Sequence, residues 1–517
     1  MLKNHLTVKK IIKNILIYTV LKTNKYWPFS YLNKLPYKIA VKLIVDYCRK
    51  FSEIKTIYAV GSFAAESYIP GISDIDLVFI FSSSRTIEDD FNVLCLFWRR
   101  YFQIKRLFPI LTHMIIYFDR HTETWTKIGI EGYEMKSRKL LLGRELADLE
   151  EVSEVKTPEM RSINYAISCY LNRFLKSIGR KTYGRNYVLQ RLCFKIIKSA
   201  DPAYMYFNSH EKQEVLLSFA DNTDMLGRIV NKLECGIRDI SIPGTRLSGS
   251  IYSEAAVNGP ADDNIFLRTY GITLEKFDEI SGYLESVTAL WENTSSFMLF
   301  IILKDRLGEI ALKKSVSCAL QVFKGLNRTP VISTYNTFKY ILRSYDPLFH
   351  VRLIRKRTVL YGRDLIPEME GPSKHIIIYR LLACALDLEK YFLNTRTFNP
   401  YFHDIDLNIR RERLGYYLEA YIIGRLLAEE NILPLSFIEA LSEFGKYNTK
   451  SCGKIKNFIN TFGYDNKGIL HIDCYALLVD ILNEIYDFAS RYIDQNKDAL
   501  VNLQPGQAAG KDILRNE

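Results

Sequence analysis

The sequence TIYAVGSFAAESYIPGISDIDLVFIF, which runs from Thr56 to Phe81, decides the fold. It begins with the strand-like run TIYAV (Thr56–Val60) and ends with the apolar run LVFIF (Leu77–Phe81). Runs of this length, rich in β-branched and aromatic residues, are typical of buried strands, whereas the glycines and the proline between them are typical of a turn. The stretch therefore predicts two neighbouring strands joined by a tight connection.

Two carboxylates stand where the second of these strands begins. Asp74 and Asp76 are two residues apart, so their side chains point to the same face of the strand, while Ile75 and Leu77 point to the other face. Two adjacent carboxylates favour a cation, and Mg²⁺ typically binds one or two carboxylates together with substrate phosphates. The pair predicts a site for Mg²⁺, with Mn²⁺ as the alternative.

Gly61 and Ser62 end the first strand, and Ser62 lies twelve residues before Asp74. A glycine lets a triphosphate approach the backbone, and a serine hydroxyl with neighbouring N–H groups can hold phosphate oxygens. The competing interpretation is that Gly61 and Ser62 form only a turn and that the carboxylates are solvated strand-end charges. The combination of two flanking strands with this spacing favours a phosphate and metal site.

The stretch resembles the signature of the polymerase-beta-like nucleotidyltransferase superfamily, in which an apolar strand, Gly-Ser and a spacer precede Asp-x-Asp. The residues Ser73–Leu77 most resemble the antibiotic-modifying and minimal branches. The resemblance implies an α/β (α+β) fold, with a mixed sheet beside a helical bundle. It also implies an enzyme, a phosphorus-group transferase, that moves a nucleoside monophosphate from a nucleoside triphosphate such as ATP to a hydroxyl-type acceptor. Asp74 and Asp76 would bind the metal and act in catalysis, and Gly61 and Ser62 would bind the nucleotide.

The third carboxylate of that family has no direct counterpart in this sequence. The next predicted strand is Ile110–Phe118, and the position that resembles the family acid is His113. A neutral histidine could accept the proton of an attacking hydroxyl, although Mg²⁺ prefers oxygen ligands. We include His113 among the predicted catalytic residues. The alternatives are that Asp119 replaces the acid in a shifted register, that catalysis is impaired, or that His113 is a structural residue.

A possible second copy of the domain follows from an internal repeat. Lys139–Leu146 reads KLLLGREL and Thr358–Leu365 reads TVLYGRDL. Three similar segments precede each octamer. Going back along the chain in the first half, they are the strand-like run THMIIYF, the helix-like segment Thr86–Leu107 and the apolar strand Leu77–Phe81. In the second half they are TPVISTY, Arg306–Leu326 and Phe297–Leu303. Asn293–Ser296 replaces the acids, so we expect the second copy to be degenerate.

Two alternatives to this repeat remain open. One places Gly249-Ser250 and Asp262-Asp263-Asn264 at the second site, with the same interval of twelve residues. The other treats the repeated octamer as chance and the second half as an unrelated helical domain.

The whole chain of 517 residues is too long for one hydrophobic core, which predicts several domains. Helical periodicity is found over Glu159–Ile178 and Asn186–Ser199, and again over Lys374–Leu393, Arg413–Asn431, Pro434–Lys446 and Ile472–Ile493. The predicted division is a basic helical segment (1–55), a nucleotidyltransferase domain (56–150), a helical domain (155–242), a linker (243–265), a degenerate copy (270–370), a second helical domain (373–495) and a disordered tail (496–517).

Composition excludes several classes of protein. With 48% hydrophobic and 25% charged residues, the chain is neither collagen-like nor disordered. Nine cysteines without regular spacing suit a reducing cytoplasm better than a disulfide scaffold or a zinc site. The sequence contains no run of 18 apolar residues, so it predicts no transmembrane segment.

The positive charge is concentrated at one end. Residues 1–55 contain twelve lysines and arginines and two acids, so they carry +10 of the total net charge of +12. This segment could steer RNA or triphosphate towards Gly61, rest on an anionic membrane, or form the solvated face of short helices.

The acceptor is not identified by these patterns, which suit a small molecule, RNA or a protein. Two further functions remain beside the enzyme proper. One is a catalytically weak nucleotide- or RNA-binding regulator, and the other is a toxin-like nucleotidyltransferase that modifies tRNA or a protein.

Overall fold

The computed structural model describes sixteen stretches of the chain. They are residues 19–20, 23–24, 26–71, 73–82, 86–122, 124, 138–145, 278–293, 296–322, 330–342, 352–354, 357–369, 374–393, 407–434, 436–462 and 470–496. The predicted helical domain at 155–242, the linker at 243–265 and almost all of the tail at 496–517 lie outside the described residues, as do residues 1–18 of the basic segment.

The chain divides into two compact units, each assembled from segments distant in sequence. The first-sheet unit contains Leu16–Val155 and Ile378–Asn502, and the second-sheet unit contains Met1–Ile15, Lys156–Ile377 and Leu503–Glu517. The C-terminal helices, which sequence order alone would assign to a separate domain, therefore belong with the first sheet.

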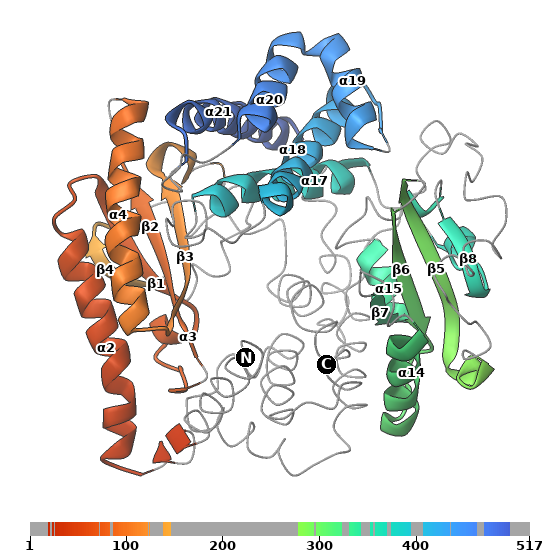
Figure 1. Cartoon of the computed structure of the whole chain (residues 1–517), viewed down its shortest axis with the longest axis horizontal. Coiled ribbons are helices and arrows are strands. Elements are labelled where there is room, and N and C mark those ends of the chain that lie inside the picture. Colours follow the sequence, from red (N-terminus) through yellow and green to blue (C-terminus); the bar gives the residue numbers. More distant parts are fainter. Residues whose placement is uncertain are drawn as a thin grey trace, which may run out of the picture. The chain divides into compact units, whose positions relative to one another are not determined.

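The first sheet has four strands in the order β3-β2-β1-β4. Their bounds are β1 Ile54–Val60, β2 Ile75–Phe81, β3 Leu111–Phe118 and β4 Lys139–Gly143. Strand β1 runs antiparallel to β2 and β4, whereas β2 and β3 are parallel. A parallel pair needs a crossover connection, which is provided here by helix α4, Ile87–Leu107 (Figure 1).

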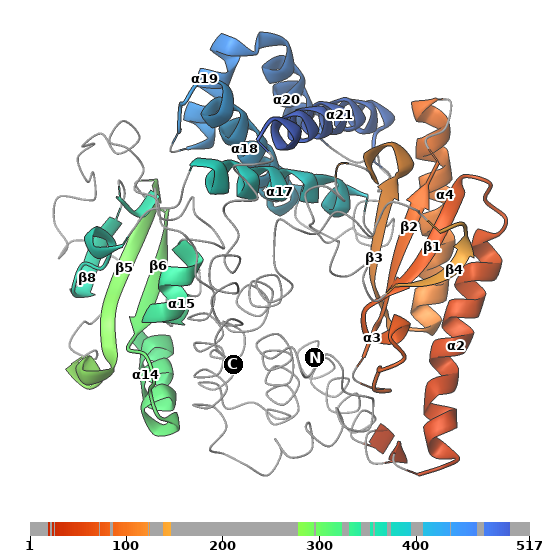
Figure 2. The same cartoon turned by 180° about the vertical axis from the view of Figure 1, so that it is seen from behind.

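Helix α4 begins where the sequence predicts. The Thr86 Oγ1 accepts a hydrogen bond of 3.1 Å from the backbone N–H of Asp89, and three acids occupy the first turn. Its buried face packs on β2 through Phe97, whose ring centroid lies 5.1 Å from that of Phe79 and 5.4 Å from that of Phe81. Helix α2, Phe29–Cys48, lies beside α4, as both views show (Figures 1 and 2).

The second sheet has the order β7-β6-β5-β8. Its strands are β5 Leu284–Asn293, β6 Ser296–Leu303, β7 Val331–Thr334 and β8 Arg357–Gly362. The crossover helix is α14, Glu309–Val322, and the short elements are η5 Ser281–Tyr283, α15 Tyr335–Tyr340 and η7 Ile366–Glu368. Its core packs Phe300 and Ile302 of β6 against Phe338 and Leu342.

The two sheets repeat one topology. Strand β5 is antiparallel to β6 and β8, and β6 is parallel to β7, as in the first sheet. The irregularity in the β1–β4 pairing between Ile57 and Tyr58 recurs in the β5–β8 pairing between Val287 and Thr288. The prediction of two sheet-bearing copies is confirmed, and the interpretation of the repeated octamer as chance is wrong.

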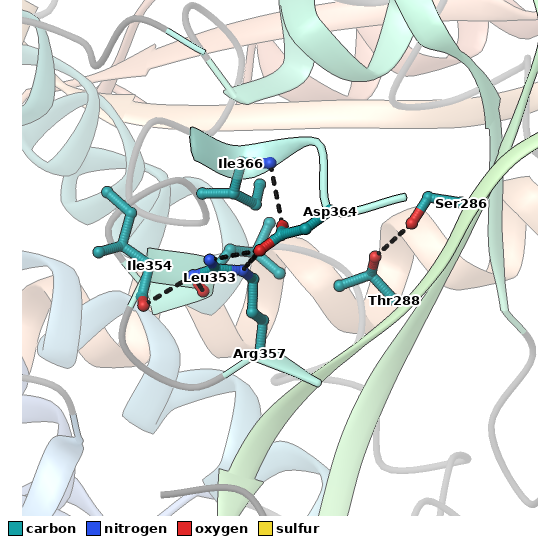
Figure 3. Close-up of polar contacts among 7 residues, drawn as sticks. All are labelled: Ser286, Thr288, Leu353, Ile354, Arg357, Asp364 and Ile366. Carbon is teal, nitrogen blue, oxygen red and sulfur yellow. Dashed lines mark hydrogen bonds and ion pairs between the residues drawn. The ribbon is translucent and has the colours of Figure 1, made fainter. Parts of the chain in front are cut away.

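The repeated octamer and the arginine just before it form the same ion pair in both sheets. In the first, Arg138 Nε lies 2.7 Å from Glu145 Oε1, and in the second, Arg357 Nη2 lies 2.6 Å from Asp364 Oδ2, seven residues further along in each case. Figure 3 shows the second pair, with Asp364 also accepting from the backbone N–H of Ile366 at 3.2 Å. The ion pair spans the strand end at Gly143 or Gly362, so the octamer fixes how the edge strand ends.

The C-terminal part of the first-sheet unit is helical. Its elements are α17 Lys374–Phe392, α18 Leu407–Glu429, α19 Phe437–Tyr447, α20 Thr449–Thr461 and α21 Ile472–Gln495. Four of them correspond to the predicted helices, whereas α20, whose sequence TKSCGKIKNFINT is mostly polar, was not predicted. No helix among the described residues is long and apolar enough to cross a membrane.

Candidate active site

Three strand ends meet at one edge of the first sheet. Val60, the last residue of β1, is paired with Asp76 of β2, and Asp76 is paired in turn with His113 of β3. Gly61 and Ser62 follow Val60 directly, and Asp74 immediately precedes β2. The backbone therefore brings the five residues predicted from the sequence to the same edge.

The carboxylate of Asp76 faces away from helix α4. Phe79 and Phe81 contact α4, so strand alternation directs Asp76 to the opposite face, as the sequence predicts. Asp74 and Asp76 are both partly exposed, while the neighbouring Ile75 and Leu77 are buried. Both residues are therefore partly exposed at the start of an otherwise buried strand, although Asp76 Oδ1 is itself buried.

Gly61 is required for backbone geometry. Its φ of +69° lies in the left-handed region, which residues with a Cβ rarely adopt. A Cβ built at this position would lie 3.5 Å from Asp76 Oδ2, an ordinary contact, so the conformation and not the space selects glycine. That distance also shows how closely the Gly-Ser turn approaches the carboxylate.

The Gly-Ser turn is closed by its own backbone. The N–H of Ala65 donates to Gly61 O at 3.1 Å, and the N–H of Ser67 donates to Ser62 O at 3.0 Å. These bonds form the single helical turn α3, Gly61–Ala64. The turn fixes Ser62 beside the strand end that carries Asp76.

Tyr37 of α2 forms hydrogen bonds to the loop that leads into Asp74. The sequence did not indicate this role. Its Oη donates to Ser73 O at 2.7 Å and accepts from the N–H of Gly71 at 3.2 Å. The loop is also closed on itself, because Ser73 Oγ accepts from the N–H of Ile69 at 2.9 Å. Tyr37 is 2% exposed, so the signal available in the sequence was a tyrosine on the apolar face of a helix, which core packing explains equally well.

Positive charge gathers around the Gly-Ser turn. Lys139, at the start of β4, places its Nζ 2.8 Å from Glu66 Oε1, four residues after Ser62. The pKa of Glu66 is lowered, first by the hydrogen bond from Lys139 and then by the charges of Lys139, Lys38 and Lys34. Three lysines from two elements thus lie close to Glu66, which follows the Gly-Ser turn.

Tyr101 of α4 lies within electrostatic reach of the site. It is 1% exposed, and burial, followed by the negative charge of Asp76, raises its pKa well above the ordinary value for tyrosine. Tyr101 therefore lies on the helix side of strand β2.

Asp119 does not belong to this site. It follows β3 at the end where Phe118 is paired with Phe81, and it forms an ion pair with Lys55. Five residues of strand, at about 3.3 Å each, separate that end from Asp76, a distance of roughly 17 Å. The alternative in which Asp119 replaces the third carboxylate is wrong.

The oxygen donors fit a magnesium ion that shares its ligands with a substrate. No cluster of three or more His, Cys, Asp or Glu side chains suited to a metal occurs in the described part of the chain. Two partly exposed carboxylates at the start of one strand still match the mode in which Mg²⁺ takes one or two protein carboxylates and completes its shell with phosphate oxygens.

Comparison with family models gives one match, the nucleotidyltransferase domain, over residues 41–146. This range contains β1 to β4, the crossover helix and all five predicted site residues. Residues 41–146 are thus similar to a nucleotidyltransferase domain in sequence. No curated protein and no solved structure matches the chain.

The matched nucleotidyltransferase domain can be compared with the second sheet position by position. Thr56 pairs with Ile80 in the first sheet and Ser286 pairs with Ile302 in the second, so β2 and β6 correspond with Ile80 at Ile302. Counting back along the strand places Met298 at the position of Asp76 and Ser296 at that of Asp74. Neither can act as an anionic metal ligand.

The connection that carries the Gly-Ser turn is also missing from the second copy. Fourteen residues separate β1 from β2, whereas only Thr294 and Ser295 separate β5 from β6. The alternative that placed Gly249-Ser250 and Asp262–Asn264 in the second site concerns residues that lie outside the described ones. The second copy has lost both halves of the predicted site.

Proposed function

We propose that the first-sheet unit transfers a nucleoside monophosphate from a nucleoside triphosphate, such as ATP, to a hydroxyl-type acceptor. The observation that supports this most is the meeting of Gly61, Asp76 and His113 at one sheet edge, inside the residues that match the nucleotidyltransferase domain. The scattered cysteines suit a reaction in the reducing cytoplasm. The acceptor is a small molecule, an RNA or a protein.

Each residue at this edge of the sheet has a separate role in the proposed reaction. Gly61 and Ser62 hold phosphate oxygens, because the turn exposes backbone and hydroxyl donors without a side chain in the way. Lys34, Lys38 and Lys139 make the approach to this turn positive. His113 accepts the proton of the acceptor hydroxyl as that oxygen bonds to the α-phosphorus and pyrophosphate departs.

Asp74 and Asp76 would hold Mg²⁺, or Mn²⁺ in its place. When bound, the ion neutralises negative charge on the triphosphate and on the departing pyrophosphate. The chain contributes position and charge, which supply most of the acceleration in phosphoryl-type transfer.

The substitution Asp76→Asn tests this assignment. The full-length protein is incubated with Mg²⁺, a cell extract and a triphosphate labelled at the α-phosphorus, and transfer of label to the extract is measured. The variant should lose activity by about a hundredfold or more, because an amide of the same shape lacks the charge. Its melting temperature should be nearly unchanged, since Asp76 is partly exposed.

Asp119→Asn is the matched control, because it makes the same chemical change at the opposite end of the same sheet. We expect full transfer activity from this variant. Equal activity of Asp76→Asn and wild type would refute the proposed site. A wild-type protein that is stabilised by nucleotide but releases no pyrophosphate would instead identify the nucleotide-binding regulator.

A further inference from the structure

Helix α2 and the turn before it carry an unusual number of exposed apolar side chains. Of the sixteen large hydrophobic residues that are exposed in the described part of the chain, seven lie between residues 26 and 43. They are Tyr26 (66% exposed), Trp27 (85%), Phe29 (49%), Tyr31 (56%), Leu32 (51%), Ile39 (40%) and Leu43 (41%). Scattered single exposures are normal, but a cluster of this size marks an interaction surface.

The helical members of this cluster form one continuous stripe. Phe29, Leu32, Pro36, Ile39 and Leu43 follow each other at intervals of three and four residues, so they share one face of α2. The buried residues Tyr37, Ala40, Ile44 and Cys48 lie on the neighbouring face. The helix is therefore apolar on two adjoining faces, and among the described residues only the second of them is buried. We call the exposed face, with Tyr26, Trp27 and Tyr31, the outer stripe.

The border of the outer stripe is basic. Residues 26–50 contain five lysines and arginines and one acid, Asp46, which already pairs with Arg49 at 2.9 Å. Lys38 stands over the ring of Tyr31, 5.6 Å from its centroid, and Lys42 is exposed one residue before Leu43. A partner that covers the stripe therefore meets positive charge at its edge.

We propose that the outer stripe docks on the surface of a membrane that contains anionic lipid. An interfacial helix combines an apolar face with Trp, Phe and Leu and a border of lysines, and α2 has each of these. The tyrosines and the tryptophan gather at one end of the helix, and such side chains favour the boundary between lipid headgroups and acyl chains. Anionic headgroups add negative charge opposite Lys38 and Lys42, of which Lys38 also lies within electrostatic reach of Glu66.

Two other occupants fit the stripe less well. A second copy of the chain would bring the same lysines together and would place Pro36 in the contact seam, which opposes close helix pairing. RNA is bound by cations and stacking aromatic rings, and aliphatic Leu32, Ile39 and Leu43 offer no surface for stacking.

The test is co-sedimentation of the full-length protein with vesicles of phosphatidylcholine alone and of phosphatidylcholine with one third phosphatidylserine. We expect binding only to the second kind, and a loss of binding at high salt. The triple variant Leu32→Gln, Ile39→Gln, Leu43→Gln should reduce partitioning by more than about tenfold, because each change removes apolar contact area with the bilayer. Ile438→Gln, at a still more exposed site on α19 (82% exposed), should bind as the wild type does.

A second measurement guards against misfolding of the triple variant. Its melting temperature and its transfer activity with a soluble acceptor preparation should match those of the wild type, because the three side chains are exposed. Failure of the wild type to bind anionic vesicles overturns the proposal, as does equal binding by the triple variant. A dimer or a tRNA complex that the triple variant loses, without vesicle binding by the wild type, overturns it in favour of that partner.

Discussion

At the scale of single residues, the site depends on side chains that hold its loops as well as on those that would meet the substrate. Asp74, Asp76, Gly61 and Ser62 could be found from spacing, because Asp-x-Asp and Gly-Ser are local patterns. Tyr37 could not, since its partners Ser73 and Gly71 are more than thirty residues away and become neighbours only when α2 packs on the sheet.

The variant Tyr37→Phe should distinguish the effect of Tyr37 on the position of the Asp74 loop from its effect on the stability of the fold. The ring still packs against Phe63 and Tyr68, but both hydrogen bonds to the Asp74 loop are lost, so we expect the free energy of unfolding to fall by about 1 kcal/mol. The turnover number should fall by about tenfold, because the loop that carries Asp74, the proposed metal ligand, is less well placed. Urea denaturation and label-transfer kinetics measure the two effects.

Tyr47→Phe is the control, because it removes a hydroxyl from the same helix. Tyr47 Oη donates to Leu96 O of α4 at 3.2 Å and has no contact with the Asp74 loop. Turnover should be unchanged in this variant. A similar loss in both variants would mean that Tyr37 acts on the stability of α2 and not on the site.

At the scale of elements, the edge strands β4 and β8 end in the same way. Gly143 has φ +88° and Gly362 has φ +78°, and a Cβ at either position would overlap the backbone of the neighbouring strand, 1.8 Å from Lys55 O or 2.4 Å from Glu285 O. The sequence revealed this pair as a repeated octamer. Its physical reason, a close approach of two backbones at positive φ, required the strand pairing.

Gly143→Ala should therefore destabilise the first sheet by more than about 2 kcal/mol, because the overlap involves backbone that cannot move aside. The comparison is Gly453→Ala in α20, where nothing lies within 4 Å of the added methyl group. That change should stabilise the helix by about 0.5–1 kcal/mol, since alanine has the higher helix propensity. Urea denaturation of both variants should give shifts of opposite sign, and shifts of the same sign would contradict the argument.

The strand and helix order of both sheets could also be predicted, because apolar runs and a helical period are strong local signals. Helix α20 was missed because its stripe of Cys452, Ile455 and Phe458 is narrow and is surrounded by lysines and asparagines. Its amphipathic pattern is clear only once those three residues are seen to be buried.

At the scale of the whole molecule, the first sheet is completed by helices from the far end of the chain. Glu389 of α17 is fully buried; its Oε1 lies 2.9 Å from His121 Nδ1, and its Oε2 accepts a hydrogen bond from Tyr486 of α21. His121 Nε2 lies 3.1 Å from Asn483 Oδ1, and its ring is stacked on Tyr486 at 4.0 Å. No sequence pattern linked these residues, because the contacts depend on how distant segments fold together.

Glu389→Ala should cost the first-sheet unit more than about 3 kcal/mol, because it leaves buried donors of His121 and Tyr486 without their acceptor. Thermal and urea denaturation should both detect the loss. Asp46→Ala, which breaks the exposed pair with Arg49, should leave the transitions where they are. Equal effects of the two changes would show that the buried carboxylate contributes no more than a surface charge.

The contact between His121 and Glu389 also determines the order of events during synthesis. The two residues are 268 positions apart, and ribosomes extend a chain by about 5–20 residues per second, so His121 waits roughly 13 to 54 s for its partner. During this interval the whole of the second sheet is made, while the end of the first sheet lacks its covering helices. Until α17 and α21 have been translated, His121 lacks the partners that bury it in the folded chain.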